Sequence, residues 1–408
     1  MSDRLETGKI LEIAKGLSTP MYLFDLDSLA ERIQRMREIL GQGVTICYAM
    51  KANPFLVHAM KELAPKFEVC SPGEFAICER ENVPFEQIVL SGVNKEARDI
   101  EHVMRDCKGV GIYTVESVNQ YRLIADCARK YNMQVNVLLR LTSGNQFGLD
   151  EEQVELIIKN REAEPLVNIR GIQCYTGTQK KKMSHIAEEL VWLDEFCDGL
   201  LKKYNYKTEE LEYGPGLSVY YFGRDAYKNN YDELTEFAGL LEPLKKKYEI
   251  TLEMGRYIAA ECGMFISKVC DIKTNKEQNY CIIDGGINHI NYYGQTMAMK
   301  IPAFTIVKTD GEIISGSDEA MNENEKWNVC GSLCTVGDVI VKNLPTGQLH
   351  VGDIFIFYNI GAYSITEGIY LFLSRTFPVV AAYSKKGGVV VYRDMQCSDR
   401  INSRSCTL

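Results

Sequence analysis

Short apolar runs rich in β-branched and aromatic residues alternate with amphipathic stretches up to about residue 260. The runs have the length and composition of buried strands, and the stretches between them repeat apolar residues with helical spacing. The expected strands are 45–49, 67–70, 87–90, 110–114, 135–141, 169–175, 211–213 and 250–253. The clearest expected helices are 75–81, 115–131, 151–160 and 182–204. This alternation predicts about eight βα units, the number that closes a (β/α)₈ barrel.

A further strand candidate, 20–25, precedes the first unit, and the carboxylates of Asp25 and Asp27 can cap a helix over 28–40. A doubly wound open sheet would also alternate strands with helices. The barrel is favoured because no G-x-G-x-x-G fingerprint opens a first helix and because the number of units matches barrel closure.

The pattern changes after about residue 260, where short β-type runs are separated by Gly, Asn and Asp turns. These runs are 265–269, 280–284, 339–341, 354–357, 379–383 and 388–392. The most loop-like insertion is 309–326. The chain is therefore expected to form a barrel over 28–262 and an all-β domain, sandwich-like or barrel-like, over 263–408.

Composition narrows the classes of function. The chain has 408 residues, 46% apolar and 25% charged, and its net charge of -9 includes no basic block that would favour nucleic acid or a membrane surface. No apolar leader or bilayer-length span is present, so a cytoplasmic protein is expected. Fourteen cysteines without paired spacing indicate reduced thiols, and five histidines without a ligand motif predict no metal site.

Candidate chemistry lies at the carboxyl ends of the expected barrel strands. Lys51 follows the first of them, and a lysine held in apolar surroundings favours the neutral amine that forms a Schiff base. Gly214 and Gly216 form a tight turn after the seventh strand, and Arg256 follows the eighth. Each feature alone also occurs on surfaces and in ordinary turns. Their coincidence indicates a phosphorylated ligand at the usual phosphate corner of such barrels.

A lysine, a phosphate corner and Glu253 at the end of the eighth strand together indicate pyridoxal phosphate. Lys51 would carry the cofactor, the glycine turns and Arg256 would hold its phosphate, and Glu253 would keep the pyridine nitrogen protonated. Loss of CO₂ from a bound amino acid leaves a carbanion that needs a proton. Cys334 and Lys51 are the candidate donors.

Several motifs resemble those of the diaminopimelate, ornithine and arginine decarboxylase family of pyridoxal-phosphate enzymes, along nearly the whole chain. They are YAMKAN at 48–53, 67–74, 91–95, Arg140 with QFG at 146–148, EMGR at 253–256, GSLC at 331–334 with Gly337 and Asp338, and GAY at 361–363. The resemblance implies an alanine-racemase-like barrel followed by a β domain. It also implies that the N-terminal strand, within 1–27, joins that β domain.

The resemblance implies roles for individual residues. Cofactor binding would fall to Lys51, Tyr175, Thr178, Gly214, Gly216, Glu253, Gly255, Arg256 and Tyr363. Substrate binding would fall to Arg256, Tyr293, Thr335 and Tyr363, and Cys334 would donate the proton. In this family the active site lies at a dimer interface, with the cysteine loop supplied by the neighbouring subunit. A homodimer with shared active sites is therefore implied.

Departures from the family pattern narrow the range of substrates that the site is expected to accept. Tyr175 stands where the family places a histidine over the cofactor ring, and Pro215 removes a backbone donor from the glycine turn. Thr335 replaces the acidic residue that pairs with a distal amine, Gly294 replaces an aspartate, and 288–294 contains no arginine for a distal carboxylate. A charged substrate end without its partner would forfeit a few kcal/mol. The distal end of the substrate is therefore expected to be neutral or to extend out of the site.

The sequence thus predicts a pyridoxal-phosphate-dependent carboxy-lyase that removes the α-carboxylate of an amino acid. A substrate tethered through its distal carboxyl, such as a carrier-protein-linked glutamyl group, would suit the site. Three alternatives stay open: a genuine diaminopimelate or basic amino-acid decarboxylase, an amino-acid racemase, and a non-catalytic regulatory relative.

Overall fold

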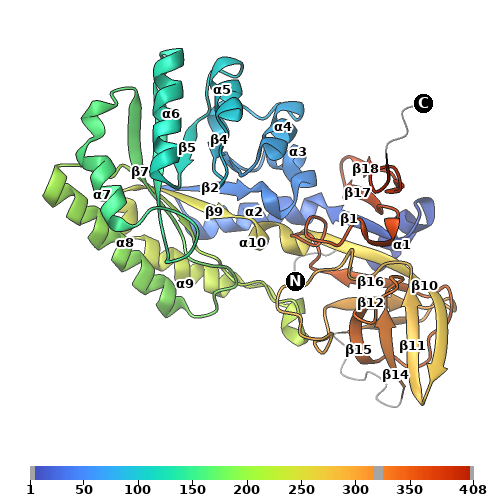
Figure 1. Ribbon diagram of the computed structural model, residues 1–408. Coiled ribbons are helices and arrows are strands. Elements are labelled where there is room, and N and C mark those ends of the chain that lie inside the picture. Colours follow the sequence, from blue (N-terminus) through green and yellow to red (C-terminus); the bar gives the residue numbers. More distant parts are fainter. Residues whose placement is uncertain (1–4, 317–324, 405–408) are drawn as a thin grey trace. The chain divides into compact units, whose positions relative to one another are not determined.

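The computed structural model describes residues 5–316 and 325–404 (Figure 1). The chain forms two compact units: a barrel unit, Ile33–Ser218 with Asn230–Tyr257, and a sheet unit, Met1–Arg32 with Val219–Asn229 and Ile258–Leu408. The domain boundaries at 28 and 262 stay a prediction. Residues 317–324 of the expected loop-like insertion lie outside the described residues.

Eight parallel strands close into a barrel in the barrel unit. They are β2 (Val44–Ala49), β3 (Lys66–Val69), β4 (Ile88–Leu90), β5 (Ile112–Val115), β6 (Val135–Leu141), β7 (Val167–Tyr175), β8 (Glu210–Gly214) and β9 (Glu249–Met254). The last strand pairs with the first, in a register that places Cys47 opposite Glu253. The predicted barrel is confirmed, and the open-sheet alternative is excluded because this sheet has no edge.

Helices alternate with the barrel strands, and side-chain caps mark where several of them begin. The helices from Leu26 to Leu241 are α2 (Leu26–Leu40), α3 (Val57–Met60), α4 (Pro72–Arg80), α5 (Ala97–Arg105), α6 (Val118–Tyr131), α7 (Glu151–Lys159), α8 (Met183–Tyr204) and α9 (Tyr231–Leu241). Ser71 and Ser117 accept hydrogen bonds from backbone N–H groups at the starts of α4 and α6, and Asp150 forms a capping box with Gln153. These caps satisfy N–H groups that lack helical partners. Each of these helices therefore begins close to its predicted first residue.

Ten strands form one mixed sheet in the sheet unit. They are β1 (Met21–Asp25), β10 (Gly263–Asn275), β11 (Gln278–Ile283), β12 (Phe304–Val307), β13 (Ile313–Ser315), β14 (Lys326–Cys330), β15 (Val339–Pro345), β16 (Ile354–Tyr358), β17 (Val379–Ser384) and β18 (Gly388–Arg393). Strand β1 pairs antiparallel with β10 and parallel with β17. The N-terminal strand thus lies between β10 and β17 in this sheet.

The β domain also contains features that the pattern did not predict. Helix α1 (Thr7–Gly16) packs Ile10 and Ile13 into the apolar cluster of the sheet, beside Met21 and Leu23. Strands β12, β13 and β14 were also missed, and β12 and β13 have only four and three residues. Within residues 5–316 and 325–404, every helix is too short or too polar to cross a bilayer.

Candidate active site

Lys51 lies at the carboxyl end of the first barrel strand, as predicted. Strand β2 ends at Ala49, and Lys51 occupies the following 3₁₀ turn, Met50–Ala52. The hydroxyl of Tyr48 donates to the carbonyl of Asn53 at 2.8 Å, and the Asn53 side chain accepts from the N–H of Phe55. These bonds stop the strand and set the direction in which the lysine leaves it.

Two buried carboxylates contact the Lys51 amine. Its Nζ lies 2.5 Å from Oε2 of Glu68 on β3 and 3.0 Å from Oε1 of Glu253 on β9. The carboxyl side chains are 3% and 6% exposed, whereas the lysine side chain is 37% exposed. The amine is therefore reachable from outside while its partners are shielded from water. Cys70 adds a thiol whose sulfur lies 3.9 Å from the same nitrogen.

The pKa values of the two carboxyl groups are shifted in opposite directions. Burial raises the pKa of Glu68, and the charge of Glu253 adds to that rise. Burial also acts to raise the pKa of Glu253, but Lys51, the hydrogen bond from Glu68 and Arg140 outweigh it and lower that pKa. Gln173 on β7 donates from Nε2 to Oε2 of Glu253 at 2.9 Å. Glu253 is thus a fixed carboxylate that stays ionised at neutral pH.

Tyr175 and Gly214 come together at the ends of β7 and β8. A Cβ on Gly214 would lie 2.5 Å from Cδ2 of the Tyr175 ring, so only glycine leaves room for that ring. Gly216 adopts φ +61°, and a Cβ there would lie 2.0 Å from the carbonyl oxygen of Gly177. Burial raises the pKa of Tyr175, and a hydrogen bond with Thr178 opposes that rise. The turn at Gly216 and the turn at Gly177 are thus in direct backbone contact.

Gly255 and Arg256 lie directly after β9. A Cβ on Gly255 would come within 2.9 Å of the carbonyl oxygen of Ala49 and of Cβ of Ala52, so this turn packs against the Lys51 segment. Arg256 begins the short helix α10 (Arg256–Ala259) and is 9% exposed. A buried guanidinium and a lysine amine thus lie on adjacent strand ends, β9 and β2.

These residues fit pyridoxal phosphate. An aldehyde needs a reachable primary amine, a pyridinium nitrogen needs an ionised carboxylate, and a phosphate needs backbone N–H groups and a cation. Lys51 supplies the amine and Glu253 the carboxylate. The Gly214–Gly216 turn supplies the N–H groups and Arg256 the cation, and all of these groups lie at one end of the barrel.

Sequence reasoning did not assign roles to Glu68, Cys70 and Gln173. Each is a polar side chain in or directly after an apolar strand, and a carboxylate or amide there is costly unless it has partners. Glu68 and Gln173 are 3% and 2% exposed. That interruption of an apolar run was the available signal. It does not by itself identify the partner strand.

The remaining predicted residues, Cys334, Thr335, Tyr293 and Tyr363, belong to the sheet unit. Cys334 and Thr335 are exposed in the turn between β14 and β15, and Tyr293 is 48% exposed. Tyr363 has φ +66° in the Gly-Ala-Tyr turn, an uncommon conformation for an aromatic residue.

Asp338 holds the cysteine turn in place. Its Oδ2 accepts from the N–H of Leu333 at 2.7 Å, and its Oδ1 accepts from the N–H of Ile287 at 2.8 Å. A Cβ on Gly331 would lie 2.3 Å from the same carboxylate, so glycine is needed there. The carboxylate is thus occupied in shaping the turn that presents Cys334.

Comparison with known proteins agrees with this chemistry. The family model described as the pyridoxal binding domain of pyridoxal-dependent decarboxylases matches residues 26–260. An L-glutamyl-(BtrI acyl-carrier protein) decarboxylase from Niallia circulans is 25% identical, over 92% of this chain and 91% of the relative. A diaminopimelate decarboxylase from Methanocaldococcus jannaschii is 26% identical, over 95% of this chain and 93% of the relative.

Solved structures show the same architecture. The crystal structure of a diaminopimelate decarboxylase from M. jannaschii superposes with a TM-score of 0.80 at 25% identity, covering 95% of this chain and 92% of that one. A lysine/ornithine decarboxylase from Vibrio vulnificus, complexed with cadaverine, superposes with a TM-score of 0.76 at 22% identity, covering 93% and 100%. The second likeness supports the fold alone.

Proposed function

Because the chain belongs to the family of pyridoxal-dependent decarboxylases, we propose that its substrate is an amino acid whose distal end is neutral or tethered to a carrier protein. The chain is a carboxy-lyase that uses pyridoxal phosphate. The observation that carries the substrate proposal is the cysteine turn. Residues 331–337 contain no charged side chain, and the carboxylate of Asp338 is already bonded to two backbone N–H groups.

Each candidate residue has a defined task in this reaction. When bound, pyridoxal phosphate supplies an electron sink for the pair left on Cα after CO₂ departs. Lys51 holds the cofactor through its Nζ, and the ionised Glu253 keeps a proton on the pyridine nitrogen. The Tyr175 ring covers the cofactor without adding charge. Cys334 delivers a proton from Sγ to Cα, which completes the exchange of CO₂ for hydrogen.

Further contacts are proposed around the phosphate and the substrate. Gly214, Gly216 and Gly255 offer backbone N–H groups to the phosphate, and Thr178 and Tyr363 add hydroxyl groups. Arg256 would bind both the phosphate and the substrate carboxylate. Tyr293 and Thr335 contact the distal part of the substrate.

We propose that two copies of the chain share their active sites, with Cys334 supplied by the neighbouring subunit. Its exposed turn, held from behind by Asp338, is suited to enter another subunit. A mixture of Lys51→Ala and Cys334→Ala variants, reassembled from dissociated subunits, tests this. Half of the dimers would be hybrids with one native site each, so about a quarter of wild-type activity should return. No recovery would place both residues in one subunit.

The substrate proposal is tested by measuring CO₂ release from free and carrier-linked amino acids. Free diaminopimelate, lysine, ornithine and glutamate are compared with a glutamyl thioester on an acyl-carrier protein. The proposal expects the thioester to be preferred by at least about a hundredfold in kcat/KM. Faster turnover of free diaminopimelate, the substrate of several relatives by name, would overturn the substrate and leave the decarboxylase chemistry intact.

We further propose a cytoplasmic location. The cysteines of the described residues are free thiols, and many are buried, which suits a reducing compartment. Cell fractionation with an antibody to the chain would test this location.

A further inference from the structure

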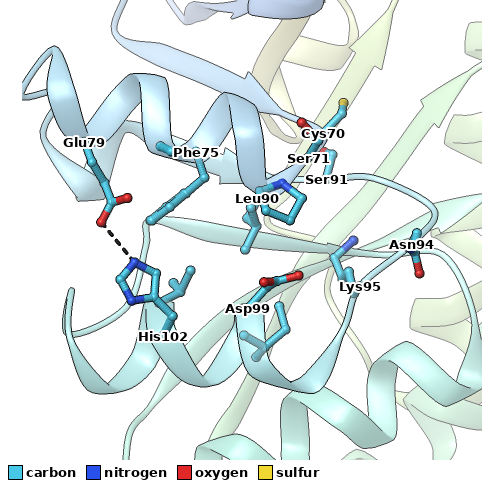
Figure 2. Close-up of a pocket in the computed structure, with 14 residues that line it drawn as sticks. Cys70, Ser71, Phe75, Glu79, Leu90, Ser91, Asn94, Lys95, Asp99 and His102 are labelled. Atoms are coloured by element: carbon cyan, nitrogen blue, oxygen red, sulfur yellow. Dashed lines mark hydrogen bonds and ion pairs between the residues drawn. The ribbon is translucent and has the colours of Figure 1, made fainter. Parts of the chain in front are cut away.

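A pocket of about 210 Å³ lies between α4 and α5 in the barrel unit (Figure 2). One part of its lining comes from Cys70 and Ser91, directly after strands β3 and β4. Glu79 on α4 and His102 on α5 also line it, and a dashed line joins them in Figure 2. The proposed decarboxylation makes no use of these two residues.

Three different metal-binding groups converge where Glu79 and His102 line the pocket. Oε1 of Glu79 lies 3.0 Å from Nε2 of His102 and 3.6 Å from Sγ of Cys107, which follows α5. All three ligand atoms lie within 4.8 Å of one another. The residues are 23 and 5 positions apart in the chain, so no ligand spacing marks them in the sequence. The packing of α4 against α5 brings them together.

The spacing of these atoms matches a tetrahedral zinc site. With Zn–N and Zn–O bonds of about 2.0 Å and Zn–S bonds of about 2.3 Å, tetrahedral angles separate O from N by about 3.3 Å and S from either by about 3.5 Å. The two separations from Oε1 of Glu79, 3.0 and 3.6 Å, need only small adjustments, and the third, between Nε2 of His102 and Sγ of Cys107, lies within 4.8 Å. One carboxylate and one thiolate would also balance the charge of a divalent ion.

The imidazole of His102 is oriented as in many zinc sites. Its Nδ1 lies 2.8 Å from Oδ2 of Asp106, which leaves Nε2 directed to Glu79. A carboxylate on the far nitrogen is the usual support of a zinc-bound histidine. Arg105 holds Asp106 through two hydrogen bonds, and the edge of the imidazole packs on Phe75 with centroids 6.1 Å apart. The ring is therefore fixed on both sides.

An ion pair between Glu79 and His102 would account for part of this arrangement. A hydrogen bond from the Cys107 thiol to the same carboxylate oxygen would account for the rest, so metal titration decides between these contacts and a metal site. We propose that Glu79, His102 and Cys107 bind a zinc ion, with Asp106 supporting the histidine and a fourth position open to water. The ion joins α4 to α5, so its main effect is on stability. The site is independent of the decarboxylase chemistry.

The test uses the cofactor-loaded protein, reduced and stripped of metal with a chelator. Zn²⁺ is titrated by calorimetry, and Co²⁺ is titrated for its ligand-field bands at long visible wavelengths, away from the absorption of the cofactor. We expect one ion per chain with a tetrahedral cobalt spectrum. Zinc should raise the melting temperature, because the unfolded chain does not assemble the site.

Two ligand variants, His102→Ala and Cys107→Ser, should lose the cobalt bands and the zinc-dependent rise in melting temperature. Asp106→Asn should weaken zinc binding about tenfold, because it removes only the support of the imidazole. Melting curves recorded without metal show whether each variant is folded.

Matched controls exist in the same chain. His58 also pairs with a carboxylate, Glu81 at 2.9 Å, and Cys270 is an exposed thiol. His58→Ala and Cys270→Ser should bind zinc as the wild type does. Absence of stoichiometric binding, or cobalt bands that survive both His102→Ala and Cys107→Ser, would overturn the site.

Discussion

The Nζ of Lys51 lies 3.0 Å from Oε1 of Glu253, although 202 residues separate them in the chain. Barrel closure produces this contact, because β2 and β9 are neighbours in the sheet. A half-exposed amine and a buried carboxylate are thereby held at adjacent strand ends. The first prediction replaces this carboxylate, and the second changes the glycine turn at the end of β8.

Replacing Glu253 with glutamine should separate cofactor attachment from catalysis. Lys51 keeps its amine, so the cofactor should still attach, and mass spectrometry after borohydride reduction would detect it on this lysine. CO₂ release should fall at least about a hundredfold, because a neutral amide cannot hold a proton on the pyridine nitrogen. Gln173→Leu, which removes only a hydrogen bond to Glu253, should cost less. Wild-type activity in Glu253→Gln would remove this carboxylate from the mechanism.

A methyl group on Gly214 should disturb the cofactor site through Tyr175. The new Cβ would lie 2.5 Å from the ring, and such overpacking costs about 1–3 kcal/mol. Spectrophotometric titration of Gly214→Ala should show weaker cofactor binding. Its thermal melting curve should show a lower melting temperature. Gly239→Ala on α9 is the control, because no atom lies within 4 Å of its added Cβ and alanine favours a helix. Equal behaviour of both variants would contradict this account.

Much of the barrel could be predicted because each strand has a local signature. All eight expected runs became barrel strands, and Lys51 and Glu253 lie at strand ends as expected. In the sheet unit, β13 was missed because it has only three residues, too few to show an alternating pattern.

Contacts between distant segments set the limit of prediction in the site. The role of Glu68 depends on its alignment beside β2, which no periodicity shows. Glu79 and His102 meet through the packing of α4 on α5, so their spacing carries no signal. Both cases are tertiary contacts between residues that look ordinary in their own segments.

The buried His289 should make the fold sensitive to acid. Burial lowers the pKa of its imidazole from about 6.5 to about 3, helped by Arg393 and Arg375. The unfolded chain takes up this proton near pH 6.5 and the folded chain does not. The contribution of His289 to stability is therefore full above pH 6.5 and is lost as the pH falls towards 3, by up to about 1.4 kcal/mol per pH unit.

Urea unfolding of wild type and His289→Gln at several pH values measures this contribution. The difference between their free energies of unfolding should shrink as the pH falls from 6.5 to 4.5. The exposed His185 provides the control, because His185→Gln should follow the wild type at every pH. A difference that is constant with pH would mean that His289 titrates normally in the folded chain.

Introducing an acidic residue at Thr335 should change the choice of substrate. The turn at residues 331–337, which is exposed over 334–337, offers no charge to a distal amine, and an aspartate next to Cys334 would supply one. An ion pair formed in a shielded site contributes a few kcal/mol, so Thr335→Asp should raise kcat/KM for free ornithine or lysine by about tenfold to a hundredfold. The carrier-linked substrate should gain nothing, because its distal end bears no amine. Val336→Asp, at a fully exposed neighbouring position, controls for the added charge. An equal gain in both variants would indicate general attraction of cations, and no gain in Thr335→Asp would mean that this residue does not contact the distal end.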